Sequence, residues 1–325
     1  MRSVVALRLA VALIAGLAAC ATARVAIGPW QAPLGREHPL TGRVLDTRTG
    51  RFVTADAMVQ AAATARFVLL GEKHDNPDHH QIQAAVLRAI LATSRRPIVA
   101  FEMFTPDDAP ALARFLGTAP RDATGLGAAV DWKNNGWPDW AYYQPIAQAA
   151  LDAGVPIVAA NLTQATARAL ARGQRAALPA NLAEHYALDQ PPSAALQAAL
   201  TTEIREAHCG HFPADRVDGM VLAQRARDSA LAESLVAGAD GGVLIAGTGH
   251  VRNDRGVPAY LRRRVPDATI ATLAPLEVRT EWTQPSDYAR AYGGALPFDW
   301  VWFTPGMDDD DPCARFRRPP TPPRG

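Results

Sequence analysis

The sequence predicts an α/β fold, in which a mostly parallel sheet is flanked by helices and a helical insertion occupies residues around 163–238. Two observations support this prediction. Stretches with helical periodicity alternate with apolar runs, which is typical of βαβ units. The apolar runs have the length and composition of buried strands, and they lie at 66–70, 96–104, 155–162, 241–250 and 267–275. A chain of 325 residues, 48% of them hydrophobic, can build one large core.

The first twenty residues have the pattern of a targeting signal. Arg2 and Arg8 precede an apolar run that ends in Leu-Ala-Ala-Cys at residues 17–20. The eleven residues 9–19 would span about 17 Å as a helix, which is less than the ~30 Å hydrocarbon core of a membrane. We therefore expect residues 1–19 to be a cleaved signal peptide rather than a membrane span.

The end of this signal resembles the lipobox of bacterial lipoproteins, with Cys20 as the lipidated first residue of the mature chain. An ordinary secretory signal with a chance cysteine is the alternative. A lipid anchor at Cys20 would hold the protein beside a membrane, and Ala21 is typical of the outer-membrane default. Residues 20–41 are then the lipidated N-terminus and a linker that contains Pro and Gly.

A single α/β domain is expected over 42–304. It begins with a hairpin at 42–53, which turns at Thr49-Gly50, and a short helix at 58–65. After the strand at 66–70, Asn76 is placed to cap a helix whose first turn contains Pro77 and Asp78. Further helices are predicted at 107–116, 137–154 and 256–265.

The insertion at 163–238 is mostly helical, with breaks at Pro191-Pro192 and Pro213. The tail, 305–325, contains four consecutive acidic residues and a Pro-rich end. We expect it to be disordered beyond Cys313. Besides Cys20 the chain has two cysteines, and an even number in an oxidising compartment suggests a disulfide between Cys209 and Cys313.

Polar side chains follow four of the predicted strands, where sites form in open parallel sheets. They are Glu72, His74, Glu102, Asn161 and His250. Carboxylates brought together out of water repel one another, so a metal ion, or Arg252 with protonated imidazoles, would be needed to offset the repulsion. The set Glu72, His74, Glu102 and His250 could ligate a divalent metal or act as general acids and bases.

His79 and His80 lie at the start of a helix, and we expect at least one of them at the surface. The segment His208-Cys209-Gly210-His211 could be a fragment of a metal site, but no second pair of ligands matches it. We prefer a loop that the disulfide holds in place. A near-neutral chain, with a net charge of +1, shows no electrostatic footprint for nucleic acid.

Aromatic residues gather in one segment, at Trp132, Trp137, Trp140, Tyr142 and Tyr143. They could start a helix that packs into the core. Alternatively, they could form a flat platform for a planar ligand, with a tyrosine ligating haem iron. Tyr142 and Tyr143 cannot both face inward, because neighbouring helical residues point about 100° apart.

Several of these segments together resemble the ChaN-like family of haem-binding lipoproteins. They are residues 69–83, "FEMF", the aromatic stretch to Pro145, "HCGHFP", residues 218–232 and "GTGH". The resemblance covers about residues 42–304. The wider superfamily, with TraB proteins, Tiki metalloproteases and erythromycin esterases, shares two G-x-x-H motifs with a Glu between them. Here these are Gly71 to His74, Glu102, and Gly247 to His250, and the helix with Gln224 to Asp228 is similar to one in those relatives.

The resemblance implies a haem-binding lipoprotein of the cell envelope that serves iron acquisition. The protein would be anchored through Cys20 in the outer membrane and would face the periplasm. The residues expected to contact haem are Tyr142, Tyr143, Trp140, His74 and His250. Expected partners are an outer-membrane haem receptor and a second copy of the chain. The alternative is a metal-assisted or Glu/His-dependent hydrolase that uses Glu72, His74, Glu102 and His250.

Overall fold

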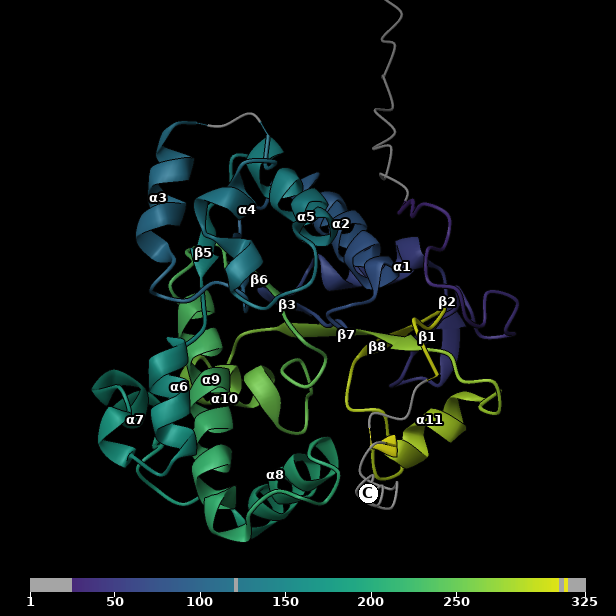
Figure 1. The fold of residues 1–325 in the computed structure, drawn as a ribbon. Helices are drawn as coiled ribbons and strands as arrows, with labels where there is room; N and C mark the ends of the chain where they lie inside the picture. The colour runs from purple at the N-terminus through teal and green to yellow at the C-terminus, as the bar shows by residue number, and fades with distance from the viewer. Residues whose placement is uncertain (1–24, 120–121, 310–312, 315–325) are drawn as a thin grey trace, which may run out of the picture.

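The computed structural model describes residues 25–119, 122–309 and 313–314, whose strands form one eight-stranded sheet (Figure 1). The strands are β1 Val44–Asp46, β2 Arg51–Val53, β3 Phe67–Leu70, β4 Ile98–Phe101, β5 Ile157–Ala159, β6 Gly242–Ile245, β7 Ile270–Glu277 and β8 Trp300–Thr304. Their order is β2-β1-β8-β7-β3-β6-β4-β5. Neighbours from β8 to β5 are parallel, whereas β1 runs antiparallel to both β2 and β8. The predicted mostly parallel sheet is confirmed.

Helices cover both faces of the sheet (Figure 1). One face carries α1 Ala55–Ala62, α2 Pro77–Leu91, α3 Ala109–Gly117, α4 Leu126–Ala129, η1 Trp132–Asn134 and α5 Trp140–Asp152. The other carries α6 Gln164–Ala171, α7 Ala180–Tyr186, α9 Val217–Val236, α10 Gly256–Arg264 and α11 Pro285–Ala291. Along β3, Val68 and Leu70 pack in the first core, and Phe67 and Leu69 pack in the second. Successive strand residues point to opposite faces, so a strand buried on both faces is apolar throughout.

The predicted helical insertion follows β5. It consists of α6, η2 Arg175–Ala177, α7, α8 Ala194–Ala207, η3 Ala214–Arg216 and α9. The break expected at Pro191-Pro192 falls between α7 and α8, and Pro213 precedes η3. Helix α8 packs on α9 through a small separate cluster of Leu200, Ile204, Val217 and Val221. Within the insertion, α6, α7 and α9 therefore pack in the core of the second face, whereas α8 lies beyond it.

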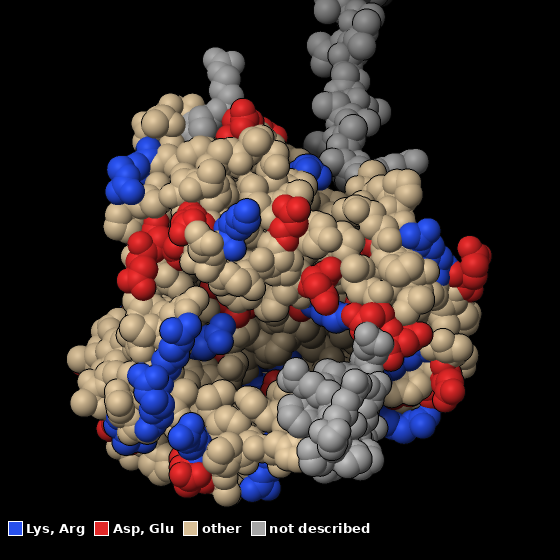
Figure 2. Space-filling model, viewed as in Figure 1, with Lys and Arg blue, Asp and Glu red and all other residues tan. Residues whose placement is uncertain are grey.

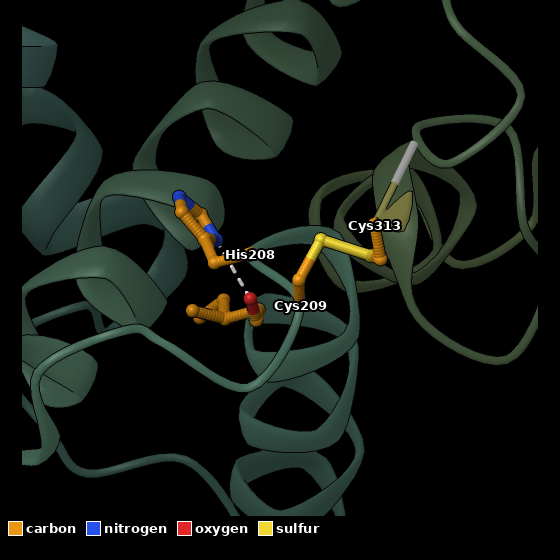
Figure 3. The surroundings of a disulfide bond; sticks show 4 residues. His208, Cys209 and Cys313 are labelled. Atoms are coloured by element: carbon orange, nitrogen blue, oxygen red, sulfur yellow. Dashed lines mark hydrogen bonds between the residues drawn. A yellow bond between two sulfur atoms is a disulfide. The ribbon is translucent and has the colours of Figure 1, made fainter. Parts of the chain in front are cut away.

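The disulfide between Cys209 and Cys313 is present, and it joins the insertion to the C-terminal tail (Figure 3). Cys209 lies in the turn after α8 with a φ of 57°, a conformation that non-glycine residues rarely adopt. His208 beside it contacts the carbonyl of Ile204 through Nδ1 at 2.7 Å. Since the cysteine forms a disulfide, the segment is a braced turn and not a fragment of a metal site.

Residues 25–41, which were expected to be a linker, lie against the body where the structure describes them. The backbone N–H groups of Gln31 and Ala32 donate to the buried carboxylate of Asp78, and Leu34 forms a bridge with Gly306. The predicted signal peptide, Cys20 and residues 315–325 lie outside the described residues. Within the described part, no helix has the length and apolarity needed to cross a membrane.

Four elements were not predicted from the sequence, namely α4, η1, α11 and β8. Strand β8 lies between β7 and β1, and so connects the parallel part of the sheet to the hairpin. The sequence of β8, Trp-Val-Trp-Phe-Thr, is short and lies close to the acidic tail. Hydrophobic periodicity therefore did not predict it as a strand.

Candidate functional site

The carboxyl ends of β3, β6 and β4 lie side by side in the sheet, because β6 pairs with both of its neighbours in parallel. Glu72 follows β3, Glu102 follows β4, and the loop from Gly247 to His250 follows β6. The structure brings these residues together at one edge. Asn161, after β5, lies next to them, and its side-chain amide donates to the carbonyl of Glu102 at 3.0 Å.

Glu72 is the centre of the first half of the site. It is buried, and its Oε1 lies 2.6 Å from Nδ1 of His74 and accepts a hydrogen bond from the hydroxyl of Tyr143 at 2.8 Å. Its Oε2 lies 3.3 Å from Nδ1 of His80, without hydrogen-bond geometry. Burial alone would raise the pKa of Glu72, but the nearby charge of His80 and the contact with His74 hold it well below its usual range.

Glu102 is the centre of the second half. Its carboxylate accepts from Nη2 of Arg227 at 2.7 Å and from the backbone N–H of Gly247 at 2.7 Å. His250 lies between two acids, with Nε2 3.2 Å from Glu102 and Nδ1 2.6 Å from Asp228. Burial opposes protonation of His250, but Glu102 and Asp228 outweigh it and raise the pKa of His250 to about 10. His250 therefore carries a proton at neutral pH.

His74 is the member of the cluster that opens to solvent. Its side chain is 35% exposed, and its ring meets the edge of Trp137 at a centroid distance of 4.9 Å. With Nδ1 fixed by Glu72, Nε2 faces the backbone of Gly247, where an added Cβ would lie 3.1 Å from it. Burial lowers the pKa of His74, but Glu72 outweighs this effect and raises the pKa above its ordinary value. Gly247 thus leaves the space that His74 needs.

The cluster opens into a cavity of about 1390 Å³. Its walls come from the loops after β3 and β6, the end of β7, helix α11 and the start of the tail, and they include Glu72, Lys73, His74, Gly247, Leu276, Val278, Arg279, Trp282, Tyr292 and Asp308. Figure 2 shows a deep hollow in this central region, between the body of the sheet and the lower helices. A cavity of this size at a strand edge is typical of a ligand site.

Arg252, the expected partner of the carboxylates, does not reach them. Both ends of its guanidinium bind Asp254, at 2.7 and 2.9 Å. Arg227 neutralises Glu102 instead, and Asp228 next to it orients His250. Arg227 and Asp228 belong to α9, in the segment from Gln224 to Asp228. The sequence analysis noted this segment as similar to a helix of the relatives but assigned it no role, and that similarity was the feature that could have indicated both residues.

The expectation that His79 or His80 lies at the surface is wrong, since both are buried. His79 accepts the backbone N–H of Lys73 at 2.8 Å, and burial lowers the pKa of His79 to about 3. His80 contacts the carbonyl of His74 at 2.9 Å and packs against Tyr143. His79 thus shapes the loop after β3, and His80 belongs to the site.

Residues 58–261 match a family model described as "Haem-binding uptake, Tiki superfamily, ChaN", which covers more than half of the chain. This chain belongs to the ChaN family. No protein among the curated sequences matches it.

Several solved structures are similar to this ChaN-family chain. ChaN of Campylobacter jejuni, whose structure is described as showing cofacial haem binding, is 20% identical with a TM-score of 0.61, and the match covers 80% of this chain and 95% of that one. This likeness shows a shared fold. The type III effector HopBA1 is 14% identical (TM-score 0.43, coverage 86% and 100%), and a mutant of erythromycin esterase EreC in its open conformation is 11% identical (TM-score 0.42, coverage 83% and 99%).

Most of the aromatic stretch of this ChaN-family chain packs in the core. Tyr143 is fully buried, and Trp132 packs against both Trp140 and Tyr143 at centroid distances of 4.9 and 4.8 Å. Trp140 and Tyr142 are half-buried and line neither the large cavity nor the smaller one beside Glu102 that is described below. Tyr143 is enclosed and donates its hydroxyl to Glu72, whereas Trp137 contacts His74 and lines the smaller cavity. Contact of haem with Trp140, Tyr142 or Tyr143 stays a prediction.

His250 is buried with both ring nitrogens engaged, so His74 is the cluster imidazole that faces the cavity. Contact of His250 with haem stays a prediction. Among the residues that the structure describes, no group of three or more His, Cys, Asp or Glu side chains is arranged to hold a metal ion. Glu72, His74, Glu102 and His250 neutralise one another in pairs, so the predicted divalent-metal centre lacks support.

Proposed function

We propose that this ChaN-family protein binds haem in the large cavity, with His74 beside the iron. The family match is the observation that carries the proposal. The cavity residues fit such a ligand. Leu276, Val278 and Trp282 offer apolar surface to a porphyrin, and Arg279 at the rim offers a cation to its carboxylates.

His74 fits the role of iron ligand because a carboxylate holds its Nδ1 and its partly exposed side chain lines the cavity. A histidine ligand in proteins commonly has its second nitrogen hydrogen-bonded in this way, which fixes the orientation of the ring. Bound haem would supply the iron centre. The chain's residues would orient it and shield it from water.

Titration of hemin into the purified mature protein tests this function. We expect saturable binding with a shift of the Soret band, and we expect His74→Ala to weaken it by at least about tenfold. Tyr142→Phe is the matched control, because Tyr142 does not line the cavity. Absence of a Soret shift in the wild type would reject haem binding, whereas loss of binding in Tyr142→Phe alone would reject His74 as the ligand.

We further propose that the protein works in the cell envelope, in haem or iron acquisition, attached through a lipid on Cys20 to the outer membrane. The lipobox-like ending of the first twenty residues supports this location. A Cys20→Ser variant should move from the membrane fraction to the soluble fraction, and an unchanged distribution would contradict the anchor. This role implies two partners, an outer-membrane haem receptor and a second copy of the chain. The apparent mass of the protein in solution, measured with and without hemin, tests whether a dimer forms.

Hydrolysis by Glu and His side chains is a second candidate function, favoured by one observation. Asp228, His250 and Glu102 form a continuous buried chain, and Glu72 orients His74 at the opening, as a general base would require. The purified protein should then hydrolyse 4-nitrophenyl acetate, and His74→Asn should lower the rate by about 10²-fold or more. Equal rates in the two proteins would reject this function and leave haem binding untouched.

A further inference from the structure

A second cavity, of about 490 Å³, lies beside the same cluster. It is built by the loops after β4 and β5, by η1 and the turn that follows it, and by α6 and α9, and its residues include Met103, Asp107, Trp137, Leu162, Arg168 and Arg227. Trp137 touches His74, and Arg227 touches Glu102. We call this cavity the side pocket. It therefore meets the cluster through different residues from those that line the large cavity.

Two side chains of the side pocket, Arg227 and Arg168, are cationic and have N–H donors available for a ligand, while Asp107 and Asp108 supply carboxylates to the same pocket. The amide of Asn161 is used by Glu102 and Leu162, and the carboxylate of Asp108 accepts from both the N–H and the hydroxyl of Thr105. Arg227 uses Nη2 for Glu102 and keeps 30% of its side chain exposed. Each arginine carries five N–H donors, so one contact leaves most of them for a ligand.

Arg168 adds a second guanidinium at the mouth. It is exposed on α6, and its Nη2 binds Gln164 one turn earlier, which holds the side chain in place. Figure 2 shows basic side chains over α6, facing acidic ones near the start of α3 across the pocket region. Planar guanidinium groups in this arrangement favour carboxylate or phosphate oxygens over other acceptors.

Charged groups of both signs lie around Arg227. Three carboxylates, Glu72, Glu102 and Asp228, lie among four basic side chains, His74, His80, His250 and Arg227. Asp107 and Asp108 also line the side pocket. An anion that binds Arg227 therefore enters a region in which buried carboxylates already have basic partners.

The apolar part of the pocket sets the shape of the ligand. Trp137 is half-buried, and Met103 and Leu162 are buried at the base of the pocket. An indole face beside two guanidinium groups suits a flat apolar body that carries one anionic group.

We propose that the side pocket is a binding site for small organic oxyanions with a flat apolar body, such as aryl carboxylates or aryl phosphates. Arg227 and Arg168 bind the oxyanion, and Trp137 contacts the body. This site is separate from the haem cavity, and it delivers an anionic group next to Glu102 and His250.

The test follows the indole N–H signal of Trp137 in protein labelled with ¹⁵N-tryptophan, assigned with Trp137→Phe. The probes are benzoate, phenyl phosphate and the neutral benzamide. Benzoate and phenyl phosphate should shift this signal saturably, and benzamide should bind at least about tenfold more weakly, as expected for loss of a charged hydrogen bond. The relative strength of the two anions tells whether carboxylate or phosphate is preferred.

Arg168→Gln should weaken both anions by about tenfold and leave benzamide unchanged. Arg172→Gln removes the same charge from an exposed position one turn further along the chain and should change nothing. Equal binding of benzamide and benzoate would overturn the proposal. So would wild-type affinity in Arg168→Gln, or a shift confined to a tryptophan other than Trp137. None of these results depends on haem.

Discussion

Folding shifts the pKa values of two buried histidines, His79 and His250, in opposite directions, and together these shifts should give the protein a stability maximum near pH 6.5. The pKa of His79 is lowered to about 3 by burial, so below pH 6.5 the unfolded state binds the extra proton and acid destabilises the fold. The pKa of His250 is raised to about 10 by Glu102 and Asp228 against burial. Between 6.5 and 10 the folded state holds the extra proton, so alkali destabilises it.

Urea denaturation between pH 5 and 10 checks this prediction. Each group contributes a slope of up to about 1.4 kcal/mol per pH unit in its window. His250→Gln should flatten the alkaline side of the profile, and His79→Gln the acid side. A profile whose alkaline side is unchanged in His250→Gln would show that His250 is not protonated in the folded protein.

Gly247 is the second residue on which the site depends, because of the space it leaves. A methyl group there would lie 3.1 Å from Nε2 of His74, so Gly247→Ala should push the imidazole aside and lower hemin affinity by about tenfold, while the fold remains. Gly249→Ala is the control, since its Cβ would meet its nearest atom at 3.5 Å, an ordinary contact. Hemin titration of both variants decides, and equal losses would contradict this account.

At the scale of elements, the buried side chain of Asn76 ties the loop between β3 and α2 to the C-terminal part of the chain. The Oδ1 of Asn76 accepts the N–H of Asp78, and its Nδ2 donates to Glu277 at 2.8 Å and to the carbonyl of Pro305 at 3.0 Å. The same residue thus caps α2 and ties it to the end of β7 and to the segment after β8. This explains how a loop rich in titratable groups keeps a fixed shape.

Asn76→Ala should therefore cost more than an ordinary helix cap. We expect a loss of about 2–4 kcal/mol in the free energy of unfolding, since the cap and the partners of a buried donor are lost together. Thr54→Ala, which removes the exposed cap of α1, should cost about 1 kcal/mol. Urea denaturation measures both, and similar losses would show that the tertiary contacts of Asn76 contribute little.

At the scale of the whole molecule, the disulfide connects two distant parts of the chain. It joins residues 104 positions apart, after the end of α8 and in the tail after β8. Helix α8 is also held by its small cluster on α9, by the hydrogen bond from Gln197 to Asp218 and by the ion pair of Glu203 with Arg255. Closing so long a loop restricts the unfolded chain strongly.

A double Cys209→Ser, Cys313→Ser variant should lose about 2–4 kcal/mol of unfolding free energy. Urea denaturation of this variant, and of the wild type with and without reductant, gives the measurement. Equal midpoints in all three would mean that the bridge does not constrain the unfolded state.

Much of the fold followed from local pattern. Apolar runs such as 67–70 and 242–245 predicted buried strands, and the residues directly after them predicted the carboxyl edge of the sheet as the site. Arg227 and Asp228 escaped this reasoning because α9 is buried on several sides, so its apolar periodicity does not show which face meets the strand ends. The burial of His80 was also not predicted, because the start of a helix is usually exposed.

The sequence by itself determined most of the strands and helices, the mostly parallel sheet, the edge at which Glu72, Glu102 and His250 gather, and the pairing of the last two cysteines. The tertiary structure alone decided that Arg227 rather than Arg252 neutralises Glu102, that Tyr143 is buried, and that two cavities adjoin the cluster. Backbone preference is set by a few neighbouring residues, so it can be read along the chain. The partner of a charge is set by packing between segments more than a hundred residues apart, such as Glu102 and Arg227, and that becomes visible only when the chain has folded.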